Sequence, residues 1–273
     1  MLKWILLLVG VGLIYFWFKN KGRAAEVEKA NAKAKAQTPP PVIAESEEIR
    51  PCRHCGVHLP SSEGVMQEDR FYCSGAHRDA MDSKGWLGSA LWRASPNFDA
   101  RPSEIRADLV VLHHISLPPG QFRTQNSTQY IVDFFQNQLD PQAHPYFADI
   151  AERRVSSHFL IARSGRIIQF VSTQNRAWHA GESEFEGRAR CNDFSIGIEL
   201  EGDGDTVFEE AQYQALQQLI TQLQTQNPDF RFAGHSDIAP ERKTDPGAQF
   251  DWARFQKDNR LPIEKLPFGV ASR

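Results

Sequence analysis

The stretch DLVVLHH, residues 108–114, decides the fold class of this chain. Its middle is continuously apolar and rich in β-branched side chains. Such a run predicts a strand that is buried on both faces, which is typical of a sheet covered by helices on both sides. His113 then lies at the end of a buried strand.

Other segments predict the strands that pair with this one. A hairpin is predicted at His158–Val171, with its tight turn at Ser164 and Gly165. Another strand is predicted at Phe194–Gly202, where apolar and small or acidic residues alternate. This alternation places Glu199 beside Gly197, on a face with little bulk and room for a ligand.

Two amphipathic helices flank the predicted strands. The first covers Ser127–Leu139, and the second covers Thr206–Gln226 and opens on a capping box of Thr206 and Glu209. Strands with interspersed helices predict an α/β (α+β) fold, in which a mixed central β-sheet is flanked by helices.

Composition and charge limit the function classes. The chain has 273 residues, of which 41% are hydrophobic, and a formal net charge of −3. It can bury a sizeable core, and it offers no basic surface for nucleic acid. The predicted domains are a transmembrane anchor at 1–23, a linker at 24–50, a Cys3His zinc-knuckle domain at 51–84 and a single mixed α/β domain at 85–273.

The amino-terminal segment predicts a membrane helix. Trp4–Phe18 is an unbroken apolar run that approaches the ~17 to 25 residues a spanning helix needs. It ends in bulky aromatic residues, unlike the small residues of the alternative, a cleaved signal peptide. Lys19, Lys21 and Arg23 follow it, which predicts a single-pass protein of the bacterial inner membrane with its body in the cytoplasm.

A cysteine and histidine cluster follows the linker. Cys52 and Cys55 form a C-x2-C pair, and Cys73 and His77 supply a second pair. This number and spacing predict a closed structural Zn²⁺ site. Ordinary reduced thiols are the alternative, and His54 or His58 can replace His77 in the ligand set.

The stretch GHSDIAPERKTDPG, residues 234–247, concentrates polar groups in a segment of irregular backbone. Its His235 and Asp245, with His113, form the type of ligand set that zinc hydrolases use. Lys243 is then placed to stabilise an oxyanion, and Glu199 is the leading general base. The alternative is that these are core histidines and a solvated turn.

At these residues the sequence resembles the AmpD-type N-acetylmuramoyl-L-alanine amidases, a zinc amidase family that includes phage T7 lysozyme and peptidoglycan-recognition proteins. The resemblance implies a catalytic Zn²⁺ held by His113, His235 and Asp245, with Glu199 as the acid/base and Lys243 as the oxyanion-stabilising cation. It rests on five motifs in order: LVVLHHISLPPGQF (109–122), DPQAHPYF (140–147), RAWHAGES (176–183), CNDFSIGIELEG (191–202) and GHSDIAPERKTDPG.

The resemblance also implies a substrate. It is a muropeptide, in which the amide bond between the lactyl group of 1,6-anhydro-N-acetylmuramic acid and L-alanine is cleaved during peptidoglycan recycling. Trp178 and His179 are predicted to line the groove for the sugar or stem peptide. Arg154 and Arg242 are predicted to pair with peptide carboxylates.

Three alternatives remain open at this point. The chain can be a periplasmic amidase that acts on intact peptidoglycan, a non-catalytic muropeptide sensor, or an adaptor whose zinc knuckle recruits a partner. One residue departs from the family pattern: His114 stands where the family has asparagine. Because neighbouring residues of a strand point to opposite faces, His114 is predicted to lie away from the metal.

Overall fold

The computed structural model describes residues 2–36 and 47–267. The chain divides into two units, Met1–Glu48 and Ile49–Arg273. Within the first unit, the backbone but not the side chains is described for residues 2–9, 24–25, 30 and 34–36.

The described part of the first unit is largely the helix α1 (Leu2–Ala36). The apolar run Trp4–Phe18 lies inside it, and the side chains of its first six residues are outside the described set. In the part of the chain that the structure describes, no helix combines the length and apolar character needed to cross a bilayer. The predicted transmembrane anchor, and the inner-membrane location that depends on it, are therefore not supported.

The predicted linker at 24–50 is partly helical. Residues 24–36 belong to α1, because this stretch is rich in Ala, Lys and Glu, which favour helix. Residues 37–46, which hold the three consecutive prolines, lie outside the described residues.

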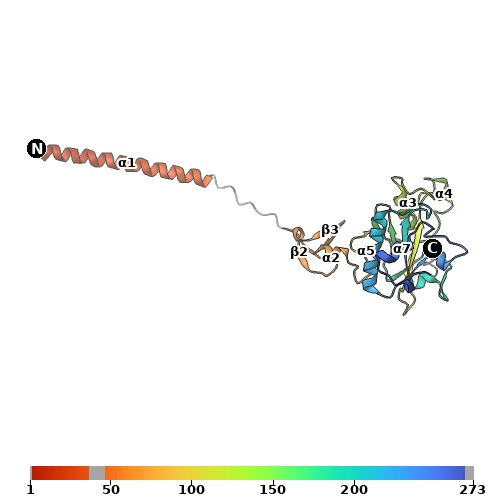
Figure 1. Ribbon diagram of the computed structural model, residues 1–273. Coiled ribbons are helices and arrows are strands. Elements are labelled where there is room, and N and C mark those ends of the chain that lie inside the picture. The colour runs from red at the N-terminus through yellow and green to blue at the C-terminus, as the bar shows by residue number, and fades with distance from the viewer. Residues whose placement is uncertain (1, 37–46, 268–273) are drawn as a thin grey trace. The chain divides into compact units, whose positions relative to one another are not determined.

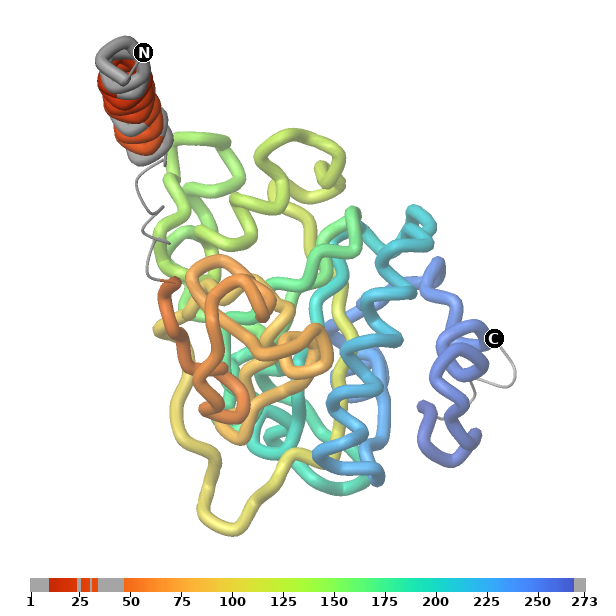
Figure 2. Tube along the Cα trace, turned by 90° about the vertical axis from the view of Figure 1, so that its left-hand side faces the viewer, coloured from red at the N-terminus to blue at the C-terminus, as the bar shows by residue number. Residues whose placement is uncertain are grey.

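The second unit begins with a small lobe that holds the cysteine cluster. Arg70 joins this lobe to the following segment, because its guanidinium donates to the Ala90 carbonyl at 2.7 Å and lies 3.9 Å from the centre of the Trp92 ring. Figure 2 shows the lobe in orange. Its elements are β1 (Ile49–Pro51), β2 (His58–Pro60), η1 (Ser61–Glu63), β3 (Val65–Gln67), β4 (Arg70–Tyr72) and α2 (Gly75–Asp79).

The rest of the unit is built on a six-stranded sheet, which confirms the predicted mixed α/β fold. All neighbouring strands are parallel except β8 and β9. Their order is β14 (Arg231–Gly234), β7 (Leu109–Ile115), β13 (Ser195–Glu201), β8 (Phe159–Ile161), β9 (Ile167–Gln169) and β5 (Leu91–Trp92).

The predicted strands are confirmed. β7 and β13 lie where the sequence places them, and β7 is buried along most of its length. β8 and β9 form the predicted hairpin, and Gly165 takes a positive φ of 81° in its turn, a conformation that favours glycine.

Helices cover the two faces of the sheet (Figure 1). α5 (Glu210–Gln226) and α7 (Trp252–Asp258) pack on the face that carries Val110 and Leu112 of β7. α3 (Ser127–Phe135) packs with Leu160 and Ile168 on the other face. Figure 2 shows α5 running alongside the strands.

The amino terminus of the long helix differs from the prediction. α5 begins at Glu210, and the capping pair is Glu209 with Gln212, whose side-chain oxygen accepts from the Glu209 amide at 3.0 Å. Thr206 instead closes a local turn, because its amide donates to the Asp203 carboxylate at 2.8 Å. α3 ends at Phe135, four residues before the predicted Leu139.

Strand register determines where the polar groups gather. Glu199 of β13 is paired with His113 of β7, so the two side chains lie on the same face of adjacent strands. This face is covered on one side by the α3 cluster and on the other by the cluster of Leu109, Val111 and Ala233. The remaining elements are β6 (Phe98–Ala100), α4 (Pro145–Ala148), β10 (Asn175–Ala177), β11 (Glu184–Phe185), β12 (Arg188–Ala189), η2 (Cys191–Asp193), α6 (His235–Ile238) and η3 (Ile263–Lys265).

Candidate active site

Three buried side chains from separate segments converge at the carboxyl ends of β7 and β14. His113 is at the end of β7, His235 follows β14 directly, and Asp245 lies in the loop after α6. The Nδ1 atoms of the two histidines are 2.9 Å apart. Asp245 Oδ2 lies 2.8 Å from His113 Nδ1 and 3.0 Å from His235 Nδ1. The three predicted ligands therefore meet in the folded chain.

The chemistry of this group fits a cation. His235 Nε2 lies 3.1 Å from the Ala180 carbonyl, and a carbonyl only accepts, so His235 carries its proton on Nε2. Its Nδ1 then presents a lone pair toward the Asp245 carboxylate, which is also an acceptor. Lone pairs that face one another in a buried site repel unless a positive charge lies between them. Two imidazole nitrogens and one carboxylate oxygen form a ligand set typical of catalytic zinc.

The ionisation of these groups agrees with a ligand role. Burial lowers the pKa of His113 to about 4, which keeps the imidazole neutral and able to ligate a metal. Burial alone would raise the pKa of Asp245, but its interactions with the imidazoles of His113 and His235 outweigh this effect and hold the pKa well below its usual range. The carboxylate is therefore ionised at neutral pH.

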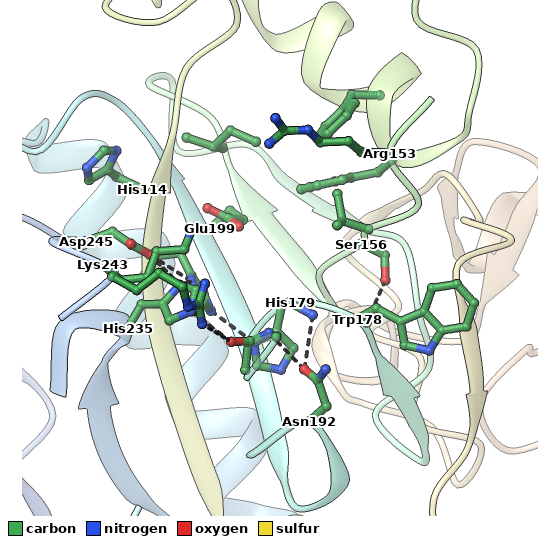
Figure 3. Close-up of a pocket in the computed structure, with 18 of the residues that line it drawn as sticks. His114, Arg153, Ser156, Trp178, His179, Asn192, Glu199, His235, Lys243 and Asp245 are labelled. Atoms are coloured by element: carbon green, nitrogen blue, oxygen red, sulfur yellow. Dashed lines mark hydrogen bonds and ion pairs between the residues drawn. The ribbon is translucent and has the colours of Figure 1, made fainter. Parts of the chain in front are cut away.

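Glu199 and Lys243 lie on the wall of the same cavity. This cavity has a volume of about 650 Å³ and is also lined by His113, His235 and Asp245. Figure 3 shows Lys243 next to His235 and Asp245, with Glu199 across from them. A carboxylate and an ammonium group thus face the space beside the ligand group, where a general base and an oxyanion-stabilising cation are needed.

Burial also perturbs Glu199 itself. Its Oε2 is buried without a hydrogen-bond partner among the described residues. Burial and the negative charge of Asp245 raise the pKa of Glu199 to about 8, while Lys243 opposes the shift. In the metal-free folded chain the carboxyl group therefore retains its proton at a pH where the unfolded chain has lost it, whereas a cation held by the adjoining ligand group would favour the ionised form that a general base needs.

This pKa predicts a pH-dependent gain in stability for Glu199→Gln in the metal-free protein. Wild-type stability falls as pH rises from about 4.5 to about 8, because in this interval unfolding releases the proton that the buried carboxyl group retains. Glutamine does not ionise, so the variant becomes more stable than wild type by a few kcal/mol at pH 8, at about 1.4 kcal/mol per pKa unit. Thermal unfolding of chelator-treated protein at pH 5 and pH 8 measures this. Parallel pH profiles for the two proteins would contradict it.

The residues predicted to bind substrate all line the cavity, but they differ in exposure and in the hydrogen bonds and ion pairs they already make. Trp178 is half-buried, and its backbone amide donates to the Ser156 hydroxyl at 3.0 Å. Arg154 is exposed and pairs with Glu152 at 3.2 Å. Arg242 donates to the backbone carbonyls of Ala180 and Glu182, so it braces this loop.

His179 lines the cavity, and its ring also fills space beside β13. Its ring packs on Gly197, where an added Cβ would lie 2.5 Å from the ring Cγ. The space above Gly197, predicted to receive a ligand, is therefore filled by a side chain of the protein. The prediction failed because the loop that carries His179 is distant in sequence from β13.

Sequence reasoning missed two residues of this site. Asn192 Oδ1 accepts from the amides of His179 and Ala180 at 3.1 and 2.8 Å, and so holds the loop in place. Its position within the CNDFSIG motif was the available signal. Arg153 lines the cavity opposite the ligand group (Figure 3), and it directly precedes the predicted Arg154 in the sequence. His114 is outside the ligand group, as predicted, and its Nδ1 has no hydrogen-bond partner within the described ranges.

The cysteine cluster also converges. Cys73 Sγ lies 3.0 Å from His77 Nδ1 and 3.9 Å from Cys55 Sγ, and Cys52 Sγ lies 3.8 Å from the same imidazole nitrogen. None of these cysteines forms a disulfide. The four ligand atoms all lie within 4.8 Å of one another. The predicted set is thus compact enough to surround one ion.

Comparison with known proteins gives consistent matches. The sequence pattern of the N-acetylmuramoyl-L-alanine amidase family matches residues 103–248. The 1,6-anhydro-N-acetylmuramyl-L-alanine amidase AmpD of Citrobacter freundii is 51% identical over 175 residues, which cover 63% of this chain and 91% of that protein. AmpD of Escherichia coli K12 is also 51% identical, with 93% of its length covered. The crystal structure of a selenomethionine AmpD derivative has a TM-score of 0.62 and 50% identity, and covers 64% of this chain and 97% of that one.

Proposed function

Because the chain belongs to the N-acetylmuramoyl-L-alanine amidase family, we propose that it cleaves the bond between the lactyl group of 1,6-anhydro-N-acetylmuramic acid and L-alanine of muropeptides, in peptidoglycan recycling. The observation that carries this proposal is the convergence of His113, His235 and Asp245 beside Glu199 and Lys243 in one cavity. Residues 85–273 are the proposed amidase domain.

The proposed metal centre is one zinc ion held by His113, His235 and Asp245. Zinc in such a site acts as a Lewis acid and makes water more acidic. Glu199 accepts the proton of the attacking water and passes it to the amide nitrogen, so that the C–N bond breaks into a lactyl carboxylate and a free L-alanine amine. The Lys243 ammonium stabilises the negative charge that develops on the carbonyl oxygen.

A cleavage assay tests the function. The purified full chain is incubated with a 1,6-anhydromuropeptide, and released stem peptide is separated by chromatography. We expect release that stops with a chelator and returns with zinc. A chain that binds the muropeptide but releases nothing would be a sensor. Faster release from intact peptidoglycan than from the anhydromuropeptide would identify the alternative substrate.

A second zinc ion is proposed in the small lobe, held by Cys52, Cys55, Cys73 and His77. The ligand atoms are close, and the first cysteine is already acidic. Burial would raise the pKa of Cys52, but hydrogen bonds from the backbone of Cys55 and Cys73, with others, lower it to about 6. A thiolate is the form that binds zinc. A lobe this small can bury little apolar surface, so the metal supplies much of its folding free energy.

Cys55→Ser is therefore expected to remove one zinc ion per chain and to lower the melting temperature of the second unit. The lobe contacts the Leu91–Trp92 strand through Arg70, so its unfolding exposes an edge of the sheet. Metal analysis and thermal unfolding measure the two effects. Cys191→Ser is the control, because Cys191 is outside the cluster, and it should leave the zinc count unchanged. An unchanged zinc count in Cys55→Ser would contradict the second site.

A further inference from the structure

A series of hydrogen bonds leads from the ligand His113 into the protein interior. His113 Nε2 lies 3.0 Å from His179 Nδ1, and His179 Nε2 lies 3.1 Å from the Ser195 hydroxyl. The hydroxyl lies 2.6 Å from the Cys191 carbonyl. We propose that His179 is a positioning residue, which holds His113 in the tautomer and ring orientation that direct its Nδ1 lone pair at the metal. This inference rests on the proposed ligand set.

The hydrogen bond between Ser195 and Cys191, at the interior end of this series, determines which atom donates in each of the other hydrogen bonds. The Cys191 carbonyl only accepts, so the single hydroxyl proton of Ser195 is donated to it. The hydroxyl oxygen must then accept from His179, which places a proton on His179 Nε2. Neither hydrogen-bond partner of the His179 ring, His113 or Ser195, is a carboxylate that would stabilise an imidazolium, so the ring is neutral and its Nδ1 carries a lone pair.

The protonation of His179 then determines the protonation of the ligand His113. Because His179 Nδ1 is an acceptor, the proton between the two rings belongs to His113 Nε2. A neutral imidazole carries one ring proton, so His113 Nδ1 is a bare lone pair. That atom is the one that lies 2.9 Å from His235 Nδ1 and 2.8 Å from Asp245 Oδ2. The hydrogen-bond pattern thus presents the nitrogen that the metal requires.

Close packing holds the His179 ring in this position. A Cβ at residue 197 would lie 2.5 Å from the ring Cγ and 2.7 Å from its Nδ1, so glycine is needed beneath the ring. Asn192 holds the backbone on either side through the amides of His179 and Ala180. The orientation of the His179 ring is therefore set by packing as well as by two hydrogen bonds.

The adjacent residue performs the same task for the other imidazole. The Ala180 carbonyl accepts from His235 Nε2 at 3.1 Å and from Arg242 at 3.0 Å. Two consecutive residues of one loop therefore orient both histidine ligands, His179 by its side chain and Ala180 by its backbone. Both residues of this motif line the cavity, and the His179 ring also contacts the ligand His113.

The test compares His179→Leu with His158→Leu in the full-length protein. His158 is the matched control: it is fully buried, and its ring centre lies 5.7 Å from that of His179. Its Nδ1 accepts from the Gly197 amide, and its Nε2 lies 3.1 Å from the Asn175 carbonyl and 3.3 Å from an Arg101 guanidinium nitrogen. Zinc affinity of the amidase site is measured by chelator competition. We expect His179→Leu to lose roughly 10- to 100-fold, in the range typical of an outer-shell partner, and His158→Leu to stay within a few-fold of wild type.

Two further measurements keep the inference falsifiable if the leucine variant does not fold. His179→Asn keeps an acceptor oxygen near the Nδ1 position, so it should retain most of the zinc affinity. Nitrogen NMR of zinc-loaded wild type should show His113 protonated at Nε2. Equal zinc affinity in His179→Leu and wild type, equal losses in both leucine variants, or a proton on His113 Nδ1 would each overturn the inference. Wild type that binds no zinc at this site would refute the ligand set instead, whereas zinc binding without amide cleavage would refute only the proposed function.

Discussion

Asp245→Asn should remove zinc from the amidase site and abolish amide cleavage. The Asp245 carboxylate is the only negatively charged member of the three-residue ligand group, and one of its oxygens contacts both imidazole nitrogens, at 2.8 and 3.0 Å. Asparagine keeps the shape but offers a neutral oxygen or an N–H group that repels a cation. The loss of zinc affinity should exceed the roughly 10- to 100-fold typical of an outer-shell partner.

Metal analysis and the muropeptide assay measure this result together. Zinc should fall from two ions per chain to one, because the cysteine cluster is untouched. Asp229→Asn is the control, since Asp229 is exposed and lies in the turn before β14, outside the cavity. It should retain both zinc ions and full turnover. A folded Asp245→Asn protein with wild-type zinc content and turnover would show that Asp245 is not a ligand.

The second large effect is expected from Glu199→Gln. This change should lower kcat by roughly two to four powers of ten, the usual contribution of a general acid/base, because glutamine cannot carry the proton from water to the leaving nitrogen. Glu199 is absent from the ligand group, so zinc content should not change. Low turnover with an intact metal centre would thus separate Glu199 from Asp245, whose loss removes both.

Glu201→Gln is a matched control for this experiment. Glu201 lies two residues further along β13 and is also buried, but its carboxylate accepts hydrogen bonds from Ser127 and Thr128. The same substitution there should reduce stability and leave kcat within a few-fold of wild type. If Glu199→Gln retained wild-type turnover, the acid/base role would have to pass to another residue of the cavity.

Stability and activity should change in opposite directions at residue 199. The buried Glu199 carboxyl group has an oxygen with no hydrogen-bond partner in the described part of the chain. At pH 8, Glu199→Gln should therefore raise the free energy of unfolding and lower kcat. Active sites commonly retain such destabilising groups. A variant that is more stable and nearly inactive would show that this carboxylate is present for chemistry.

Local sequence patterns determined the secondary structure that carries the site. The apolar run 109–112 and the alternation in 194–202 predicted β7 and β13, because a buried strand shows its pattern of apolar side chains within a few consecutive residues. Helix ends were less predictable: α5 begins at Glu210 because Thr206 is engaged by Asp203. The membrane-helix prediction rested on local hydropathy at 4–18, and the described residues do not support it.

By itself, the sequence determined the fold class and, through its motifs, which residues are candidates for the site. Only the tertiary structure decided that His113, His235 and Asp245 meet, because they are brought together by the strand order β14-β7-β13, which no local pattern records. It also decided that His179 occupies the space above Gly197 and contacts the proposed ligand His113. The physical reason is that hydrogen-bond partners and steric room depend on segments distant along the chain, whereas strand and helix propensities depend on near neighbours.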